Sequence, residues 1–267
     1  MIRIREQDLS PTLTRQLDRL QGAINRLPTF GERVANAKAQ FTARNRKDDP
    51  LFAAIRAELE AMCAGARRCM YCEDSAADEV EHIFPKRYYP NRVFDWENYL
   101  YSCGQCNVAK LSKFALRLAD GSLYKLGHAR DVLLVPPPQG RPLTLNPRHE
   151  DPTAYLMLDI AGETFLLRPR PGIGGEDIER AEYTIDLLKL NRDVLKKGRR
   201  EAFENCLFRV QLYITKRDSG AQRDELNRIV LSLERMQHPT VWIEMRRQAL
   251  RVASLAPLVA SAPEVFA

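Results

Sequence analysis

The sequence predicts an α-rich α+β protein in which a small metal-binding unit lies between two helical regions. Four cysteines form two C-x-x-C pairs, Cys69/Cys72 and Cys103/Cys106. Apolar residues recur at helical spacing before the first pair and again from Glu176 onward. Residues 119–175 are rich in glycine and proline, which is typical of turns and short strands. We therefore predict four regions: N-terminal helices in 1–65, the metal unit in 66–118, a turn-rich β extension in 119–175 and C-terminal helices in 176–267.

The N-terminal region contains three recognisable helix starts. Ser10-Pro11 and Asp49-Pro50 each place a capping side chain before a proline at the first helical position, and Thr29-x-x-Glu32 is a capping box. The first helix carries a narrow apolar stripe, which comprises Leu13, Leu17, Leu20, Ile24 and Leu27. This stripe has two interpretations: it packs on the metal unit as core, or it is a docking surface for a partner or a second copy.

The other regions give shorter signals. Residues 80–84 suit a strand that Pro85 ends, 104–118 suit a helix, and 156–160 with 164–167 suit a hairpin. In the C-terminal region we expect Asn191 to cap a long helix and Pro239 to open the last one. The tail after Pro257 is expected to be frayed.

Composition limits the class of protein and its location. The 267 residues include 41 Lys and Arg against 35 Asp and Glu, a net charge of +6 that is compatible with a polyanionic partner. No secretory signal opens the sequence and no apolar run approaches a membrane span, so we expect a cytoplasmic protein that does not enter a membrane. In a reducing compartment the paired cysteines suit a metal rather than disulfides. Cys63 and Cys206 lie outside the pattern and are expected to be idle thiols.

The order of polar residues around the cysteines interleaves two kinds of site. The four thiolates suit a structural zinc ion. Glu81, His82, Asn98 and Asn107 add nothing to such a site, but they suit a hard cation such as Mg²⁺ or Mn²⁺ and a general base. The sequence therefore predicts a zinc site that supports a small catalytic centre.

Three segments carry this pattern: Glu81-His82-Ile83-Phe84-Pro85-Lys86, Glu97-Asn98-Tyr99-Leu100 and Cys103-Gly104-Gln105-Cys106-Asn107-Val108-Ala109-Lys110. Together they resemble the HNH endonuclease signature with zinc-binding cysteines. The resemblance, which is tight over residues 66–118, implies a zinc-stapled ββα-metal HNH core embedded in the helical regions. It implies that His82 is the general base and Asn98 its orienter, and that Glu81 and Asn107 bind the catalytic Mg²⁺ or Mn²⁺. Aspartate is the commoner residue at the position of Glu81.

Several lysines and arginines follow this motif. Lys110 lies three residues beyond Asn107 on the same helix face, from which we expect it to contact a phosphate. Lys86, Arg87 and Lys113 are expected to extend this into a nucleic-acid-binding surface.

A looser resemblance extends downstream, through Leu145-Asn146-Pro147-Arg148, Asp151-Pro152 and Thr184-Ile185-Asp186-Leu187-Leu188-Lys189-Leu190-Asn191. These segments are similar to the retron- and Septu-associated (PtuB-like) nucleases, which implies anti-phage defence beside an ATPase that controls the activity. The predicted function is metal-dependent hydrolysis of DNA phosphodiester bonds. The alternatives are a zinc-stapled nucleic-acid-binding module and a scaffold subunit, both without cleavage. Nicking and double-strand cutting, and DNA and RNA, also remain alternatives.

Overall fold

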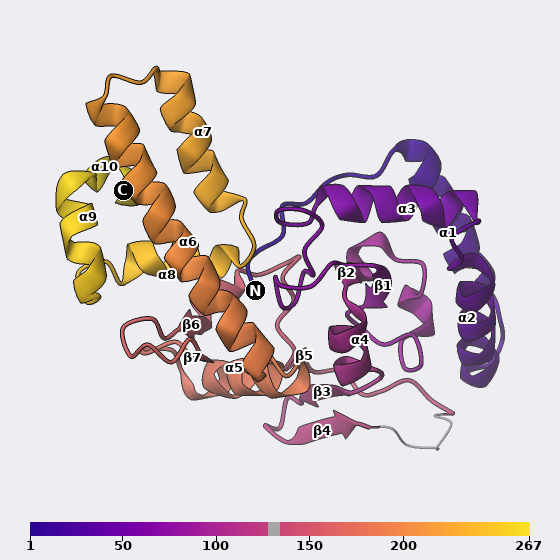
Figure 1. The fold of residues 1–267 in the computed structure, drawn as a ribbon. Helices are drawn as coiled ribbons and strands as arrows, with labels where there is room; N and C mark the ends of the chain where they lie inside the picture. The colour runs from indigo at the N-terminus through magenta and orange to yellow at the C-terminus, as the bar shows by residue number, and fades with distance from the viewer. Residues whose placement is uncertain (128–133) are drawn as a thin grey trace.

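The computed structural model describes residues 1–127 and 134–267, and its architecture is the predicted α-rich α+β fold. His128, to which the sequence assigns no role, lies outside the described residues. Figure 1 shows the N-terminal helices on one side, the C-terminal helices on the other and the cysteine-containing unit between them. One large buried apolar cluster draws residues from all four predicted regions. Among the described residues, no helix is both long and apolar enough to cross a bilayer.

The N-terminal region forms helices α1 (Pro11–Asn25), α2 (Phe30–Arg44) and α3 (Pro50–Ala61). Each begins where its capping signal predicted. The Ser10 side chain accepts a hydrogen bond from Leu13 N, Asp49 accepts one from Phe52 N, and Thr29 and Glu32 cap each other reciprocally. These side chains satisfy amide groups that the first turn of a helix leaves without intrahelical partners.

The docking interpretation of the first apolar stripe is wrong. Leu17 and Ile24 are each only 2% exposed, and Leu13 and Leu20 pack against the same core. Helix α1 contacts α2, α3 and the loop segment Pro90–Arg92 between the two cysteine pairs. These three neighbours together cover its apolar face. The centre of the stripe is therefore part of this chain's own core, with Leu13 and Leu20 half-buried against it.

The central unit is a β-hairpin followed by a short helix. Strands β1 (Glu79–His82) and β2 (Tyr99–Ser102) pair antiparallel, with Glu81 opposite Leu100, and α4 (Gly104–Lys110) follows directly. The loop between the strands contains the short 3₁₀ helices η1 (Pro90–Arg92) and η2 (Trp96–Asn98). This gives the predicted ββα order.

The helix predicted over 104–118 ends early. Leu111 adopts a left-handed backbone conformation with φ of 48°, which an α-helix does not accommodate. The chain then forms β3 (Phe114–Arg117), which pairs with β4 (Leu123–Leu126) and β5 (Arg141–Pro142). Phe114 and Leu116 are buried in a small separate cluster with Tyr88 and Leu126, and this tertiary burial outweighs the helical propensity of the segment.

The predicted hairpin is present as β6 (Leu156–Leu158) and β7 (Leu167–Pro169), preceded by η3 (Pro152–Ala154). The C-terminal region then forms α5 (Gly175–Leu187), α6 (Asp193–Asp218), α7 (Arg223–Glu234) and α8 (Pro239–Arg247). Helix α8 begins at Pro239 as predicted, but it is not the last helix as was expected. It closes with η4 (Ala253–Leu255), α9 (Ala256–Ser261) and α10 (Pro263–Phe266).

Two C-terminal predictions are wrong. The residue that precedes α6 is Arg192, whereas the Asn191 side chain exchanges two hydrogen bonds with the backbone of Leu167 and so attaches α6 to β7. The tail after Pro257 is folded rather than frayed, because Ala262 and Val265 are buried against the main core.

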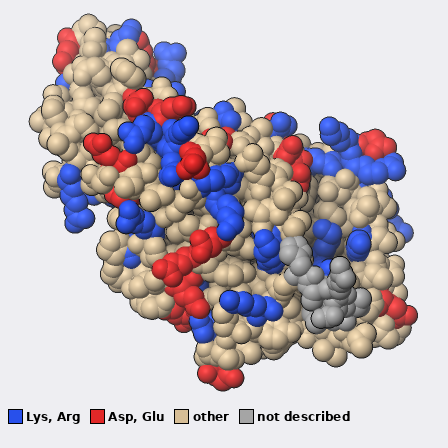
Figure 2. Space-filling model, turned by 60° about the horizontal axis from the view of Figure 1, so that its bottom comes forward, with Lys and Arg blue, Asp and Glu red and all other residues tan. Residues whose placement is uncertain are grey.

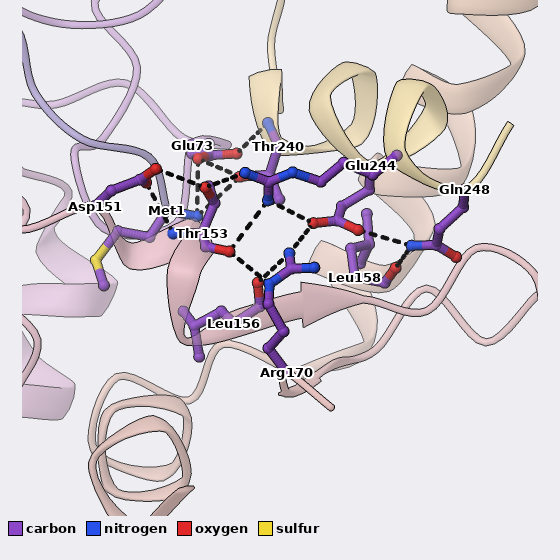
Figure 3. A network of polar contacts seen from close by, with 11 residues as sticks. Met1, Glu73, Asp151, Thr153, Leu156, Leu158, Arg170, Thr240, Glu244 and Gln248 are labelled. Atoms are coloured by element: carbon purple, nitrogen blue, oxygen red, sulfur yellow. Dashed lines mark hydrogen bonds and ion pairs between the residues drawn. The ribbon is translucent and has the colours of Figure 1, made fainter. Parts of the chain in front are cut away.

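A buried polar network connects the C-terminal helices to the rest of the fold (Figure 3). The carboxylate of Glu244 on α8 is fully buried and binds Arg170, Arg247 and Gln248, which in turn reach backbone carbonyls around β6. At the other end of α8, Thr240 binds Glu73, the residue that follows Cys72. The C-terminal helices are thereby attached to the cysteine-containing unit.

Candidate metal centre and candidate active site

The four paired cysteines form one buried cluster. Their sulfur atoms all lie within 4.8 Å of one another, and Cys72 Sγ is 3.8 Å from Cys103 Sγ. A tetrahedron with Zn–S bonds of about 2.3 Å has S–S edges of about 3.8 Å. The donor set and its spacing therefore fit a structural zinc ion. The other two thiols are separate, since Cys63 hydrogen-bonds Leu59 O and Cys206 contacts Met236.

Two tight turns build this cluster. Glu73, with φ of 64°, turns the chain after the first pair and donates its amide hydrogen bond to Cys69 O. Cys103 precedes α4, so the first turn of that helix brings Cys106 back toward it. Hydrogen bonds with Cys106, and then with Cys69 and Cys72, lower the pKa of the Cys103 thiol, whereas the hydrogen bonds of Cys106 with Cys103, Cys69 and Cys72 raise the pKa of the Cys106 thiol. A metal ion bound to all four sulfurs requires each of them as a thiolate.

A positive charge lies beside the cluster. The guanidinium of Arg192, at the start of α6, is 3.8 Å and 3.9 Å from Cys106 Sγ through its two terminal nitrogens. Four thiolates around one divalent ion carry a net charge of −2, so a nearby cation stabilises the loaded site.

His82 ends β1 and is 3% exposed. Its Nε2 is 2.9 Å from the carbonyl oxygen of Val93. Because a carbonyl oxygen only accepts, Nε2 carries the proton and Nδ1 keeps the lone pair. Burial, reinforced by the charges of Lys86 and Lys110, lowers the pKa of His82 well below its ordinary value and keeps the ring neutral.

Asn98 is fully buried in the loop that carries this carbonyl. Its side chain accepts from Phe84 N at 2.7 Å and donates to Phe84 O and Arg92 O at 3.1 Å and 2.8 Å. These bonds tie the end of β1 to the segment that presents Val93. Tyr99 also donates to Val93 O, so that the acceptor of His82 is held from two sides.

Lys110 occupies a different place from the one predicted. Its side chain is 0% exposed, and its Nζ is 2.6 Å from Glu81 Oε1 and 2.7 Å from His82 O. A fully buried ammonium does not face a substrate. Lys110 instead fixes the Glu81 carboxylate and the backbone at His82.

Glu79 is a residue that the sequence reasoning missed. It lies two residues before Glu81 on β1, and its carboxylate accepts a hydrogen bond from Asn107 Nδ2 on α4. A carboxylate only accepts, so this contact turns the Asn107 nitrogen toward Glu79 and leaves Oδ1 available as a ligand. The alternation of side chains along a strand is the signal that would have found Glu79, since residues 79 and 81 share a face.

Glu81, His82 and Asn107 line one hollow of about 560 Å³ that is open to solvent. Val34 and Lys38 of α2, together with Pro85, Lys86, Arg87, Leu111 and Ser112, complete its lining. The predicted catalytic residues Glu81, His82 and Asn107 therefore lie together at one solvent-accessible hollow. Lys86 lies over the Phe41 ring, 4.9 Å from its centre. Burial lowers the pKa of Lys86, although the nearby Glu81 opposes this.

The predicted basic surface is only partly at this hollow. Arg87 and Lys86 line it, whereas Lys113 does not and donates to Ala109 O near the end of α4. Lys38 was not predicted, because nothing in its own segment sets it apart from a solvated helix lysine. Figure 2 shows Lys and Arg interspersed with Asp and Glu over one face of the molecule, in agreement with the small net charge.

Comparison with known proteins gives a local match. Over 48 residues the chain is 48% identical to the Septu protein PtuB of Bacillus thuringiensis, a match that covers 16% of this chain and 19% of that protein. The chain thus matches about a fifth of the length of this relative. No protein-family model matches the chain.

Proposed function

We propose that this chain is a metal-dependent HNH endonuclease that hydrolyses phosphodiester bonds of DNA. The observation that carries the proposal is the convergence of Glu81, His82 and Asn107 on one open hollow, beside a four-cysteine cluster that fits zinc. A carboxylate, a carboxamide oxygen and a neutral imidazole at one accessible point are the groups that metal-assisted hydrolysis needs.

The roles of the residues follow from their contacts. His82 Nδ1 takes the proton of a water molecule, whose oxygen then attacks phosphorus while the bond to the leaving oxygen breaks. Val93 O holds the opposite nitrogen of the ring, and Asn98 holds the loop that carries Val93. Glu81 and Asn107 would hold Mg²⁺ or Mn²⁺, which would stabilise the charge on the leaving oxygen.

Lys110 acts in this mechanism as a positioning residue. It joins the metal-binding carboxylate of Glu81 to the backbone of the general base, so both keep a fixed relative placement. Glu79 acts in the same way on the amide of Asn107.

We further propose an anti-phage role in a complex with an ATPase that controls the nuclease. The local match to a Septu protein supports this assignment. Because Leu17 and Ile24 of the α1 stripe are buried in this chain's own core, we expect the partner to bind elsewhere. An ATPase should co-purify with the tagged protein from the cells in which it occurs. Purification of the tagged protein without an ATPase would contradict the complex.

Cleavage of supercoiled plasmid DNA in Mg²⁺ or Mn²⁺ tests the enzymatic proposal. His82→Ala should reduce the rate by about 10²- to 10⁴-fold, the usual contribution of a general base. Its zinc content should equal that of the unchanged protein, and His149→Ala is the matched control because His149 is an exposed histidine outside the hollow. Undiminished cleavage by His82→Ala protein would remove His82 as the base. DNA binding without cleavage by the unchanged protein would favour a binding module.

A further inference from the structure

A second hollow adjoins the candidate active site. It has a volume of about 810 Å³ and is lined by the end of α2, the α2–α3 connection, one face of α3 and the edge of the ββα unit. Glu81, Lys86 and Asn107 line both hollows. The two hollows therefore form one groove, which passes the candidate metal ligands on both sides.

The N-terminal helices supply one wall of this groove along its whole length. Lys38 of α2 lines the first hollow, and Lys47 of the connection and Arg56 of α3 line the second. Lys38 and Lys47 are exposed, and neither ammonium makes an ion pair within the described part of the chain. Among residues 1–127 and 134–267, Arg56 donates to the neutral acceptors Arg46 O and Asn45 Oδ1 and makes no ion pair.

The groove also contains carboxylates, and their position matters. Glu81 lines both hollows, where a divalent cation would offset its charge, and Glu79 lines the second hollow and accepts from Asn107. Glu60 and Asp78 line the second hollow, where Arg67 is 3.9 Å from Glu60. Lys38, Lys47 and Arg56 are thus spread along the wall, whereas the proposed metal ligand Glu81 lies where the two hollows meet.

We propose that α2, α3 and their connection form the nucleic-acid-binding wall of the groove, with Lys38, Lys47 and Arg56 on phosphates at either side of the reacting bond. The inference rests on the proposed nuclease function. A polyanionic strand fits this surface because it carries phosphates at regular intervals, whereas the metal site needs only one of them. A groove that continues past the site on both sides also accepts an internal bond, so no chain end is required.

DNA binding by inactive protein tests this proposal directly. His82→Ala protein is combined with Lys38→Ala/Lys47→Ala, and the affinity for labelled single-stranded and duplex DNA is measured by anisotropy at several salt concentrations. The matched control is Lys197→Ala/Arg251→Ala, which removes the same charge from exposed residues outside both hollows. Arg56 is left unchanged, because its contacts with Asn45 and Arg46 also support the connection.

Each lost phosphate contact should reduce the slope of log affinity against log salt by about 0.7–0.9, so the double replacement should reduce it by about 1.4–1.8. The weaker binding should affect all sequences alike, and the control should keep the original slope. Equal affinity and slope for the groove variant and the control would overturn the proposal. So would the failure of His82→Ala protein to bind either single-stranded or duplex DNA.

The test separates the groove from the chemistry. Reduced binding by the groove variant, in a protein that never cleaves DNA with either metal, would keep the binding wall and reject the nuclease. Cleavage that depends on His82 but is unaffected by the loss of Lys38 and Lys47 would keep the nuclease and reject the wall.

Discussion

Replacement of Lys110 by methionine should strongly destabilise the protein although it changes little volume. The Lys110 side chain is 0% exposed, and its ammonium lies 2.6 Å from Glu81 Oε1 and 2.7 Å from His82 O. Methionine would fill the same space and bind neither oxygen. The Glu81 side chain, which is itself 8% exposed, would then be a buried carboxylate without its cation.

The expected loss follows from that burial. Removal of one partner from a buried ion pair costs about 3–5 kcal/mol of unfolding free energy, because the remaining charge has little access to water. Replacement of both Lys110 and Glu81 by methionine removes both charges and leaves only His82 O without its donor, a loss of about 1–3 kcal/mol. The double variant should therefore be more stable than Lys110→Met alone.

The four proteins of this double-mutant cycle are the unchanged protein, Lys110→Met, Glu81→Met and the double variant. Urea unfolding of the zinc-loaded proteins, followed by tryptophan fluorescence, measures the unfolding free energy of each. Lys113→Met is the control, because the Lys113 ammonium binds a single backbone carbonyl and is only half-buried. It should change the unfolding free energy by about 1 kcal/mol or less. Stability of Lys110→Met equal to that of the unchanged protein would refute the reasoning. So would a double variant whose loss is the sum of the two single losses.

Two further predictions concern zinc and pH. Arg192→Gln should release zinc about 10- to 100-fold faster to a chromogenic chelator, because the guanidinium no longer faces Cys106 Sγ, whereas Lys197→Gln should not; equal rates would remove Arg192 from the zinc site. Burial holds the pKa of His82 well below 6.5, so on acidification the unfolded chain takes up a proton that the folded chain does not. As the pH falls below about 6.5, the unfolding free energy of the unchanged protein should therefore decrease more steeply than that of His82→Gln, by up to about 1.4 kcal/mol per pH unit. Parallel pH profiles of the two proteins would contradict this.

Local chemistry made part of the fold predictable. The helix starts at Ser10, Thr29 and Asp49 depend on side chains within three residues of the amides that they cap, so the sequence contains the whole interaction. The cysteine cluster was predictable for a related reason. Two C-x-x-C turns each bring their sulfurs together locally, and the metal chemistry then requires the pairs to meet.

Tertiary contacts made the rest unpredictable. The stripe of α1 showed that one face is apolar, but no local signal showed that this chain itself covers Leu17 and Ile24. The early end of α4 depends on the burial of Phe114 beside Tyr88, far from it in the sequence. The burial of Lys110 depends likewise on Glu81, which lies on a strand 29 residues earlier.

The short helix α4 joins the metal centre to the candidate active site. Its seven residues are too few for a stable isolated helix, so tertiary contacts must hold both of its ends. The first end carries Cys106 in the cysteine cluster, and the last residue, Lys110, binds Glu81. Asn107 lies between these two attachments and contacts Glu79. Loss of a metal ion from the cysteine cluster would release the first end of α4 and, with it, the placement of Asn107 beside Glu79. An ion bound there would thus control the geometry of a candidate site that it does not touch.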